Sequence, residues 1–265
     1  MAKKKYEEAN IQAIAETIRS KTGAEKTYDT SEMASGVTEV YDKGRTDEWS
    51  KFWDALQQNG QRTDYNYAFY TNGGLSYLWT EENFKPKYSI KPTIANRCFH
   101  RIGVKDVAKL FEDRGIVLDT SQCTDTAYLF AQCDSLHLPT LDLSVSKSIT
   151  VFIFYSSVKK IDKIIWSETI TDATNPFVGC WQLSEFESEG TLAISVSFAS
   201  CPLTVETIKG LLLCLKNYAG TSNAGTYTLT LRDTSKTAMA ELGTIPEFGG
   251  KTYDTYITDI GWNLA

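Results

Sequence analysis

Histidines and metal-type cysteine spacings are scarce in this sequence. It has 265 residues but only two histidines, His100 and His137, and none of its six cysteines forms a C-x-x-C pair. The ligand spacing of zinc sites is therefore missing. The motifs G-x-S-x-G, H-E-x-x-H, G-x-G-x-x-G and the P-loop are missing as well. We therefore expect a protein without a metal site, a cofactor or an enzymatic activity.

Long hydrophobic runs and excess positive charge are also lacking. No apolar run approaches the ~20 residues that a membrane-spanning helix needs. The basic start, Lys3–Lys5, is followed by no apolar segment of the signal-peptide type. The formal net charge is -6 and the isoelectric point is about 5.1, which argues against a nucleic-acid partner. We expect no membrane insertion and no secretory signal.

The middle of the chain repeats a short phrase that begins with phenylalanine. It reads Phe130-Ala-Gln-Cys133, Phe154-Tyr-Ser-Ser157, Phe177-Val-Gly-Cys180 and Phe198-Ala-Ser-Cys201. A period in the low twenties is typical of stacked solenoids, and of leucine-rich repeats in particular. Each unit is too small to bury its own apolar face, so its neighbours must cover that face.

Three cysteines, Cys133, Cys180 and Cys201, occupy the same position of this phrase. Equivalent positions of a solenoid stack on one another, so we predict a column of small buried thiols. Disulfides are the alternative, and we disfavour them because the chain is expected to start in a reducing compartment.

The first sixty residues predict helices with one apolar stripe. Ile11, Ile14 and Ile18 share one helix face, and Val37 and Val40 lie on the apolar line of a second helix. Little sequence nearby could cover this stripe. We therefore expect an oligomer or attachment interface, with intramolecular packing as the alternative.

The fold class that follows is α+β, in four regions. They are a helical attachment or oligomerisation region (1–60), an aromatic-rich connector (61–96), a leucine-rich-repeat-like solenoid (97–201) and an α/β C-terminal cap (202–265). In the cap, Leu203–Tyr218 reads as a helix and Thr226–Leu231 alternates as a strand. The connector is either a packed core or a platform for stacking sugars.

Several blocks of the chain carry a resemblance to known proteins. Asn10–Gly23 with Thr30–Ala34, and Phe52–Tyr65 with Phe84–Tyr88, resemble two N-terminal blocks of tail and tail-fibre proteins from phages and prophages of Gram-positive gut bacteria. The Phe-x-x-Cys units resemble the BspA-like class of leucine-rich repeats. The stretch from Leu203 to Asn263 resembles the usual terminal unit of the same proteins.

The resemblance implies a virion structural protein, either a tail fibre or a receptor-binding component that contacts the host surface. It would be synthesised in the host cytoplasm and reside in the virion tail. Its partners would be other tail or baseplate proteins and a host receptor, a glycan or a protein. We also expect a homo-oligomer, with a trimer as one arrangement. Trp166 and Trp181 are our candidates for exposed binding residues on the repeat face.

Two alternatives stay open at this point. One is a bacterial leucine-rich-repeat adhesin or interaction protein, which would normally need an export signal. The other is an enzyme acting on surface glycans, for which Glu185, Glu187 and Glu189 would supply paired carboxylates. Three like charges at every second residue are more typical of a solvated strand face.

Overall fold

The computed structural model describes residues 50, 51, 53–70 and 84–265. The chain divides into two compact units, Met1–Gln58 and Asn59–Ala265. In the first unit, residues 50, 51 and 53–56 are helical. The predicted interface residues lie outside the described residues; they are Ile11, Ile14, Ile18, Val37 and Val40.

The second unit is α+β, as predicted, and its strands pair only in parallel. One sheet joins β1 (His137–Leu138) and β2 (Leu141–Asp142) to β3 (Lys160–Trp166), which also pairs with β4 (Glu185–Gly190). A second sheet has the order β5-β6-β7. The remaining elements are η1 (Gln58–Gly60), α3 (Val107–Asp113), β5 (Val196–Phe198), α4 (Val205–Leu213), β6 (Thr228–Leu231), α5 (Asp233–Glu241), η2 (Pro246–Phe248), α6 (Tyr253–Asp259) and β7 (Asn263–Leu264).

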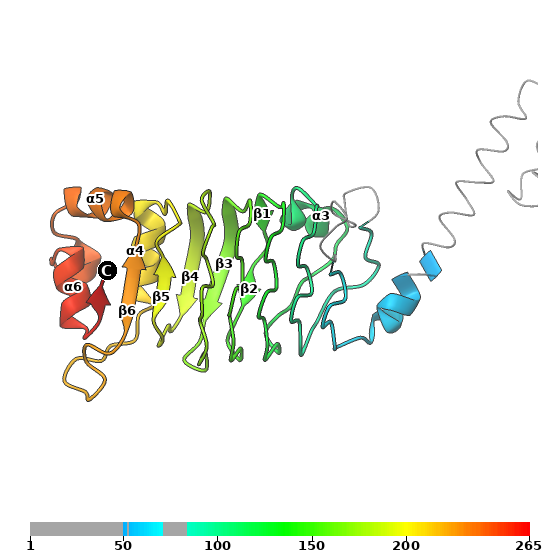
Figure 1. The fold of residues 1–265 in the computed structure, drawn as a ribbon, viewed down its shortest axis with the longest axis horizontal. Helices are drawn as coiled ribbons and strands as arrows, with labels where there is room; N and C mark the ends of the chain where they lie inside the picture. The colour runs from blue at the N-terminus through cyan, green and yellow to red at the C-terminus, as the bar shows by residue number, and fades with distance from the viewer. Residues whose placement is uncertain (1–49, 52, 71–83) are drawn as a thin grey trace, which may run out of the picture. The chain divides into compact units, whose positions relative to one another are not determined.

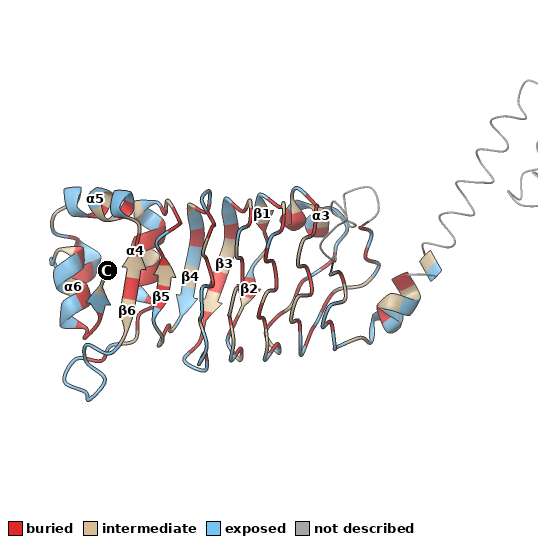
Figure 2. Ribbon diagram, in the orientation of Figure 1, coloured by how far each residue is buried: buried red, intermediate tan, exposed pale blue. Residues whose placement is uncertain are grey.

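Successive turns of the chain lie side by side along this unit (Figure 1). A second ladder of parallel bridges joins them away from the strands, linking Asp64 to Ile94, Ile94 to Asp125, Asp125 to Ser148 and Ser148 to Asp172. The ladder thus begins before residue 97, the predicted start of the repeats. Because each turn hydrogen-bonds to the next through its backbone, the apolar side chains of the turns can stack inside the unit. Figure 2 shows buried residues recurring along the successive turns.

The register of this ladder defines a column of buried apolar residues. Phe69 stacks on Phe99 at 5.2 Å and Phe99 on Phe130 at 4.8 Å between ring centroids. The next member is Ile153, because Phe130 N donates to Phe152 O and Ile153 N to Pro176 O. The sequence phrase had placed Phe154 there, which is one residue out of register. Phe177 and Phe198 continue the column at 4.4 Å.

Four successive turns, those of Phe99, Phe130, Ile153 and Phe177, each hold two residues in the left-handed backbone region, at fixed distances from the buried column. The residues two before the column are Tyr67, Arg97, Tyr128, Val151 and Asn175; those two after it are Arg101, Gln132, Tyr155 and Gly179. A left-handed conformation costs a non-glycine residue about 1–2 kcal/mol, and most for a β-branched one such as Val151. The inter-turn hydrogen bonds must offset this cost, so the turn geometry is imposed by stacking.

The predicted thiol column is present, with Ser156 in place of one cysteine. Ser156 Oγ donates to Phe130 O at 2.7 Å, Cys180 Sγ to Ile153 O at 2.6 Å and Cys201 Sγ to Phe177 O at 3.7 Å. Each side chain therefore ties its turn to the preceding one. All six cysteines are free and buried.

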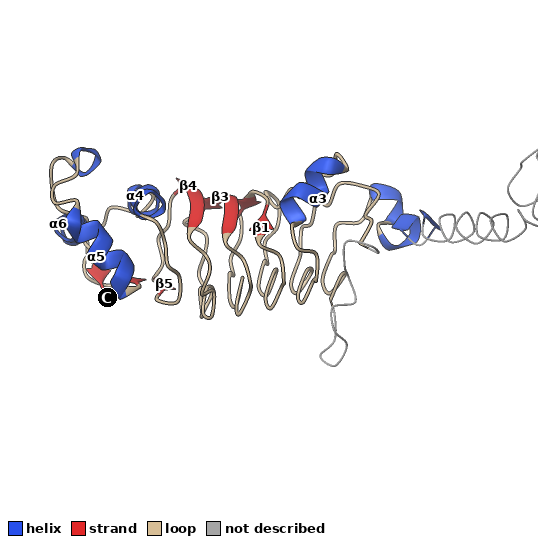
Figure 3. Ribbon diagram, turned by 90° about the horizontal axis from the view of Figure 1, so that it is seen from above, coloured by secondary structure: helices blue, strands red, loops and turns tan. Residues whose placement is uncertain are grey.

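Helices close the row of strands at both ends. α3 lies next to β1 and α4 next to β4 (Figure 3). Thr204 caps α4 by accepting from Thr207 N. This helix ends at Leu213, earlier than the predicted Tyr218, because the chain returns to the stack and bridges Leu215 to Leu192. The described residues hold no helix long and apolar enough to cross a membrane.

The hydrogen-bond register between turns predicts that substitutions at the adjacent residues Ile153 and Phe154 lower the free energy of unfolding by different amounts. Ile153→Ala removes a fully buried member of the column and should lower the free energy of unfolding by about 2–5 kcal/mol. Phe154→Ala removes a half-buried ring and should cost about 1 kcal/mol. Urea denaturation of both variants measures the difference. A larger loss at Phe154 would contradict the register.

Burial of the thiols predicts slow chemical modification. Burial raises the pKa of Cys133 to about 12 and that of Cys98 well above its ordinary value, so the reactive thiolate is rare at neutral pH. We expect a thiol reagent such as DTNB to label the native chain slowly and all six cysteines rapidly in denaturant. Rapid native labelling, located by peptide mapping, would contradict the buried column.

Candidate functional site

The left-handed turns place a group of aromatic and basic side chains on the surface. We call this surface the turn ridge; it consists of Tyr67, Arg97, His100, Arg101, Tyr128, Gln132 and Tyr155. All of its members except His100, which directly follows Phe99, occupy the left-handed positions on either side of the buried column in successive turns. Tyr67 is 47% exposed and Tyr155 is 56% exposed.

Arg97 is the central residue of the turn ridge. Its guanidinium carbon lies 4.1 Å from the Tyr128 ring centroid and 5.3 Å from that of Tyr67, one turn away on each side. Its Nη1 also donates to Tyr67 Oη at 2.5 Å. Two cation–π contacts hold the guanidinium in place while leaving several of its N–H donors unused.

His100 lies in the same turn, between the two arginines of the ridge. Its Nε2 lies 3.1 Å from Gln132 Oε1, and its ring lies 5.2 Å from that of Tyr70. Burial lowers the pKa of His100; the Gln132 hydrogen bond raises it, and the charges of Arg97 and Arg101 lower it further. The histidine is therefore held neutral by its surroundings.

The two arginines have no carboxylate partner. Within the described part of the chain, neither Arg97 nor Arg101 forms an ion pair. The nearby Asp125 is engaged elsewhere, since its carboxylate accepts from Asn96 Nδ2 at 3.1 Å and from Ala127 N at 2.9 Å. The ridge is thus a local positive surface on a chain whose formal net charge is -6.

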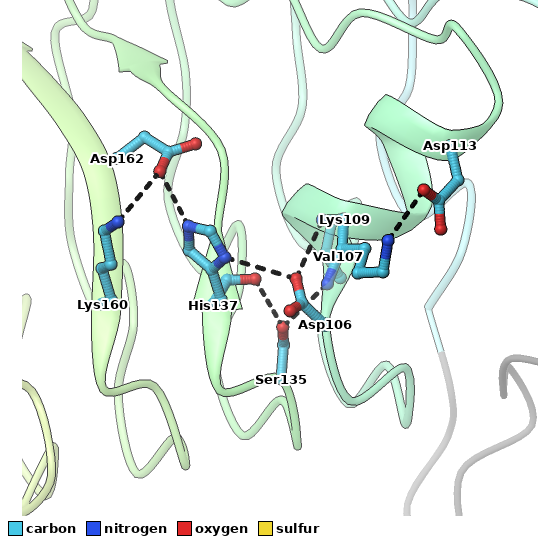
Figure 4. Close-up of polar contacts among 8 residues, drawn as sticks. All are labelled: Asp106, Val107, Lys109, Asp113, Ser135, His137, Lys160 and Asp162. Atoms are coloured by element: carbon cyan, nitrogen blue, oxygen red, sulfur yellow. Dashed lines mark hydrogen bonds and ion pairs between the residues drawn. The ribbon is translucent and has the colours of Figure 1, made fainter.

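A second polar cluster lies on the outer face of the strands. His137 Nε2 lies 2.7 Å from Asp162 Oδ1, and its Nδ1 lies 3.4 Å from Asp106 Oδ1 (Figure 4). The two carboxylates come from the neighbouring turns on either side. The pairing register of β3 with β4 shifts between Ile161 and Lys163. Such a bulge changes the direction of the Asp162 side chain.

The chemistry available to this histidine cluster is limited. Both ring nitrogens face carboxylates, and both can donate only when the ring is protonated. Asp106 also caps α3 by accepting from Lys109 N at 2.8 Å. Over residues 50, 51, 53–70 and 84–265, no group of His, Cys, Asp and Glu could hold a metal ion. The cluster therefore serves as a link between three successive turns.

Two of the three glutamates of β4, Glu185 and Glu187, line an open groove of about 860 Å³ beside α4. Lys163 Nζ lies 2.9 Å from Glu189 Oε2 and 3.7 Å from Glu187 Oε2. Glu185, Glu187 and Glu189 are all exposed, as expected for one face of a strand. Such ion pairs between neighbouring strands are typical of a solvent-exposed strand face.

The two predicted tryptophans lie in different environments. Trp166 is 2% exposed, and its Nε1 donates to Ser188 Oγ at 3.3 Å; it is a core residue and not the exposed one that the sequence suggested. Trp181, directly after Cys180, is 60% exposed. The structure does not bring the two rings together on one surface. The ridge arginines, which the sequence pattern missed, become recognisable once the left-handed positions are known.

Comparison of the chain with models of protein families, with curated proteins and with solved structures finds no match in any of the three.

The pKa of His100 predicts how stability depends on pH. An unfolded histidine has a pKa of about 6.5, and the folded pKa of His100 is lower. The unfolded chain therefore binds the proton more readily, so the contribution of His100 is complete above about pH 6.5 and is lost as the pH falls below it.

Denaturant titrations between about pH 5 and about pH 7.5 measure this dependence. His100→Gln should make the free energy of unfolding fall less steeply with acidification than in the parent. His137→Gln is the matched control, and it should retain the contribution of His100. An unchanged slope in His100→Gln would contradict the assignment.

Proposed function

We propose that this chain is a non-enzymatic structural protein of a virus particle, a tail fibre or receptor-binding component that contacts the host surface. The observation that carries the proposal is the turn ridge, a surface on which successive turns repeat one backbone geometry and present exposed tyrosines beside half-buried basic side chains. The block order that resembles phage tail proteins supports the same conclusion from the sequence.

We also propose that the stacked turns form a solenoid of the leucine-rich-repeat type. Parallel pairing of every described strand, a column of buried phenylalanines with Ile153 as one member, and a repeated side-chain hydrogen bond to the preceding turn all support this description. Since each turn contacts only its neighbours, such a stack can present an extended surface without a deep catalytic pocket.

The N-terminal helices would attach or oligomerise the chain in this proposal. The amphipathic stripe predicted from the first forty residues supports that role. The partners would then be other tail or baseplate proteins on one side and a surface receptor on the other.

Purified phage particles from the strain that encodes the chain provide the test. Mass spectrometry should detect the chain as a stoichiometric particle component, and native mass determination of the isolated chain should give a homo-oligomer. The labelled chain should also bind intact host cells. Absence from the particles would overturn the virion proposal, and absence of cell binding would overturn the receptor-binding role.

A further inference from the structure

We propose that the turn ridge binds an anionic polysaccharide, with the Arg97 and Arg101 guanidinium groups paired to the acidic groups of the glycan. This inference rests on the proposed surface-binding function and names the chemistry of its ligand.

The positive charge of the turn ridge favours an anionic ligand. Arg97 and Arg101 lie four residues apart in one turn, and both act on His100 between them. Within the described residues neither has an ion pair, whereas Lys163 on the strand face is paired with two carboxylates. A guanidinium binds a carboxylate, sulfate or phosphate group through two parallel hydrogen bonds, which makes Arg suited to this recognition.

The ridge is also organised before any ligand arrives. Tyr67 and Tyr128 hold the Arg97 guanidinium from both sides, and the hydrogen bond to Tyr67 Oη fixes its rotation. Holding a long side chain in its bound conformation reduces the entropy lost on binding. A solvated arginine without a ligand needs no such support.

Uncharged groups of the ridge match the hydroxyls of a sugar. Gln132 and the tyrosine hydroxyls supply donors and acceptors in neighbouring turns, and the exposed Tyr155 ring lies flat over Gly179, where a Cβ would meet ring atoms at 2.7 Å. Neighbouring turns lie about 4.8 Å apart, so the ridge offers its groups at regular steps. A polymer that repeats both acidic groups and hydroxyls can contact the arginines and the uncharged groups of the ridge in successive turns.

Nucleic acid fits the ridge less well. Duplex DNA carries one charge per about 1.7 Å of its axis, and a chain with a formal net charge of -6 repels such a polyanion. A glycan with at most one acidic group per sugar has a lower charge density and can pair with two arginines. DNA therefore serves as a competing probe in the test.

The test uses the full chain and three oligosaccharide probes. Oligogalacturonate carries carboxylates, κ-carrageenan oligosaccharides carry sulfate esters at no more than one per sugar, and dextran oligosaccharides are neutral; the first two distinguish the source of the anion. At least one anionic probe should bind at low salt and weaken as salt is added, while dextran should not bind. Equal binding of dextran, or binding of neither anionic probe, would overturn the proposal, as would tighter binding of duplex DNA.

Matched variants assign the binding to the ridge. Arg97→Gln with Arg101→Gln should reduce affinity by about tenfold or more, because both charge-assisted contacts to the anion are lost. Lys147→Gln with Lys159→Gln removes the same charge from exposed positions elsewhere and should change affinity by less than about twofold. Equal losses in the two double variants would overturn the assignment to the ridge.

Two further measurements keep the test independent of folding. Arg101→Gln alone leaves the Arg97 contacts with both tyrosines intact, and it should still weaken binding. NMR titration of His100 should show its pKa rising when the anionic probe is bound, because the anion offsets the charges that lower it. An unchanged His100 pKa at saturation would place the probe elsewhere. Particles that contain the chain while these assays fail would overturn this inference alone.

Discussion

The structure depends on backbone hydrogen bonds between successive turns at a single register. Tyr65, Tyr67 and Phe69 donate in sequence to Ile94, Asn96 and Cys98, and the same alternate pattern recurs in the following turns. In the turns of Phe99, Phe130, Ile153 and Phe177, two residues of each turn lie in the left-handed region. The apolar side chain between them then points inward, and the flanking side chains point outward. The buried column and the exposed ridge are therefore two consequences of one backbone arrangement.

Side chains with hydrogen-bonding atoms reinforce this register at both ends of the turn. Asp125 Oδ1 accepts from Ala127 N and Asp172 Oδ1 from Thr174 N, each two residues further along the chain. On the other side of the buried residue, Ser156, Cys180 and Cys201 donate to the preceding turn. A thiol and a hydroxyl are interchangeable here because each is small and can donate one hydrogen bond. The cysteines thus stabilise the stack without forming disulfides.

The sequence predicted the α+β class, the thiol column and a strand over Thr226–Leu231, observed as Thr228–Leu231, since each depends on local alternation or on position within the repeat. It misplaced Phe154, because an aromatic residue was taken as the mark of the buried position. Backbone register, set by Ser148 five residues before Ile153, determines that position instead. Trp166 was misjudged for a related reason: the register shift after Ile161 changes which residues of β3 face inward. Periodicity alone cannot reveal such a shift.

Charge is distributed differently on the two surfaces of the stack, and this difference separates structural from binding residues. On the strand face, His137 meets two carboxylates and Lys163 meets two more, so charges there are balanced across turns. On the turn ridge, Arg97 and Arg101 are supported by aromatic rings and an amide neighbour but are left unbalanced. Exposed ion pairs each contribute about 0–1 kcal/mol to stability. Stability alone therefore does not explain how charge is distributed on either surface. Besides burial, the charges of Arg97 and Arg101, which have no ion-pair partner within the described residues, lower the pKa of His100 and repel each other. An anion bound at the ridge would relieve both effects of charge.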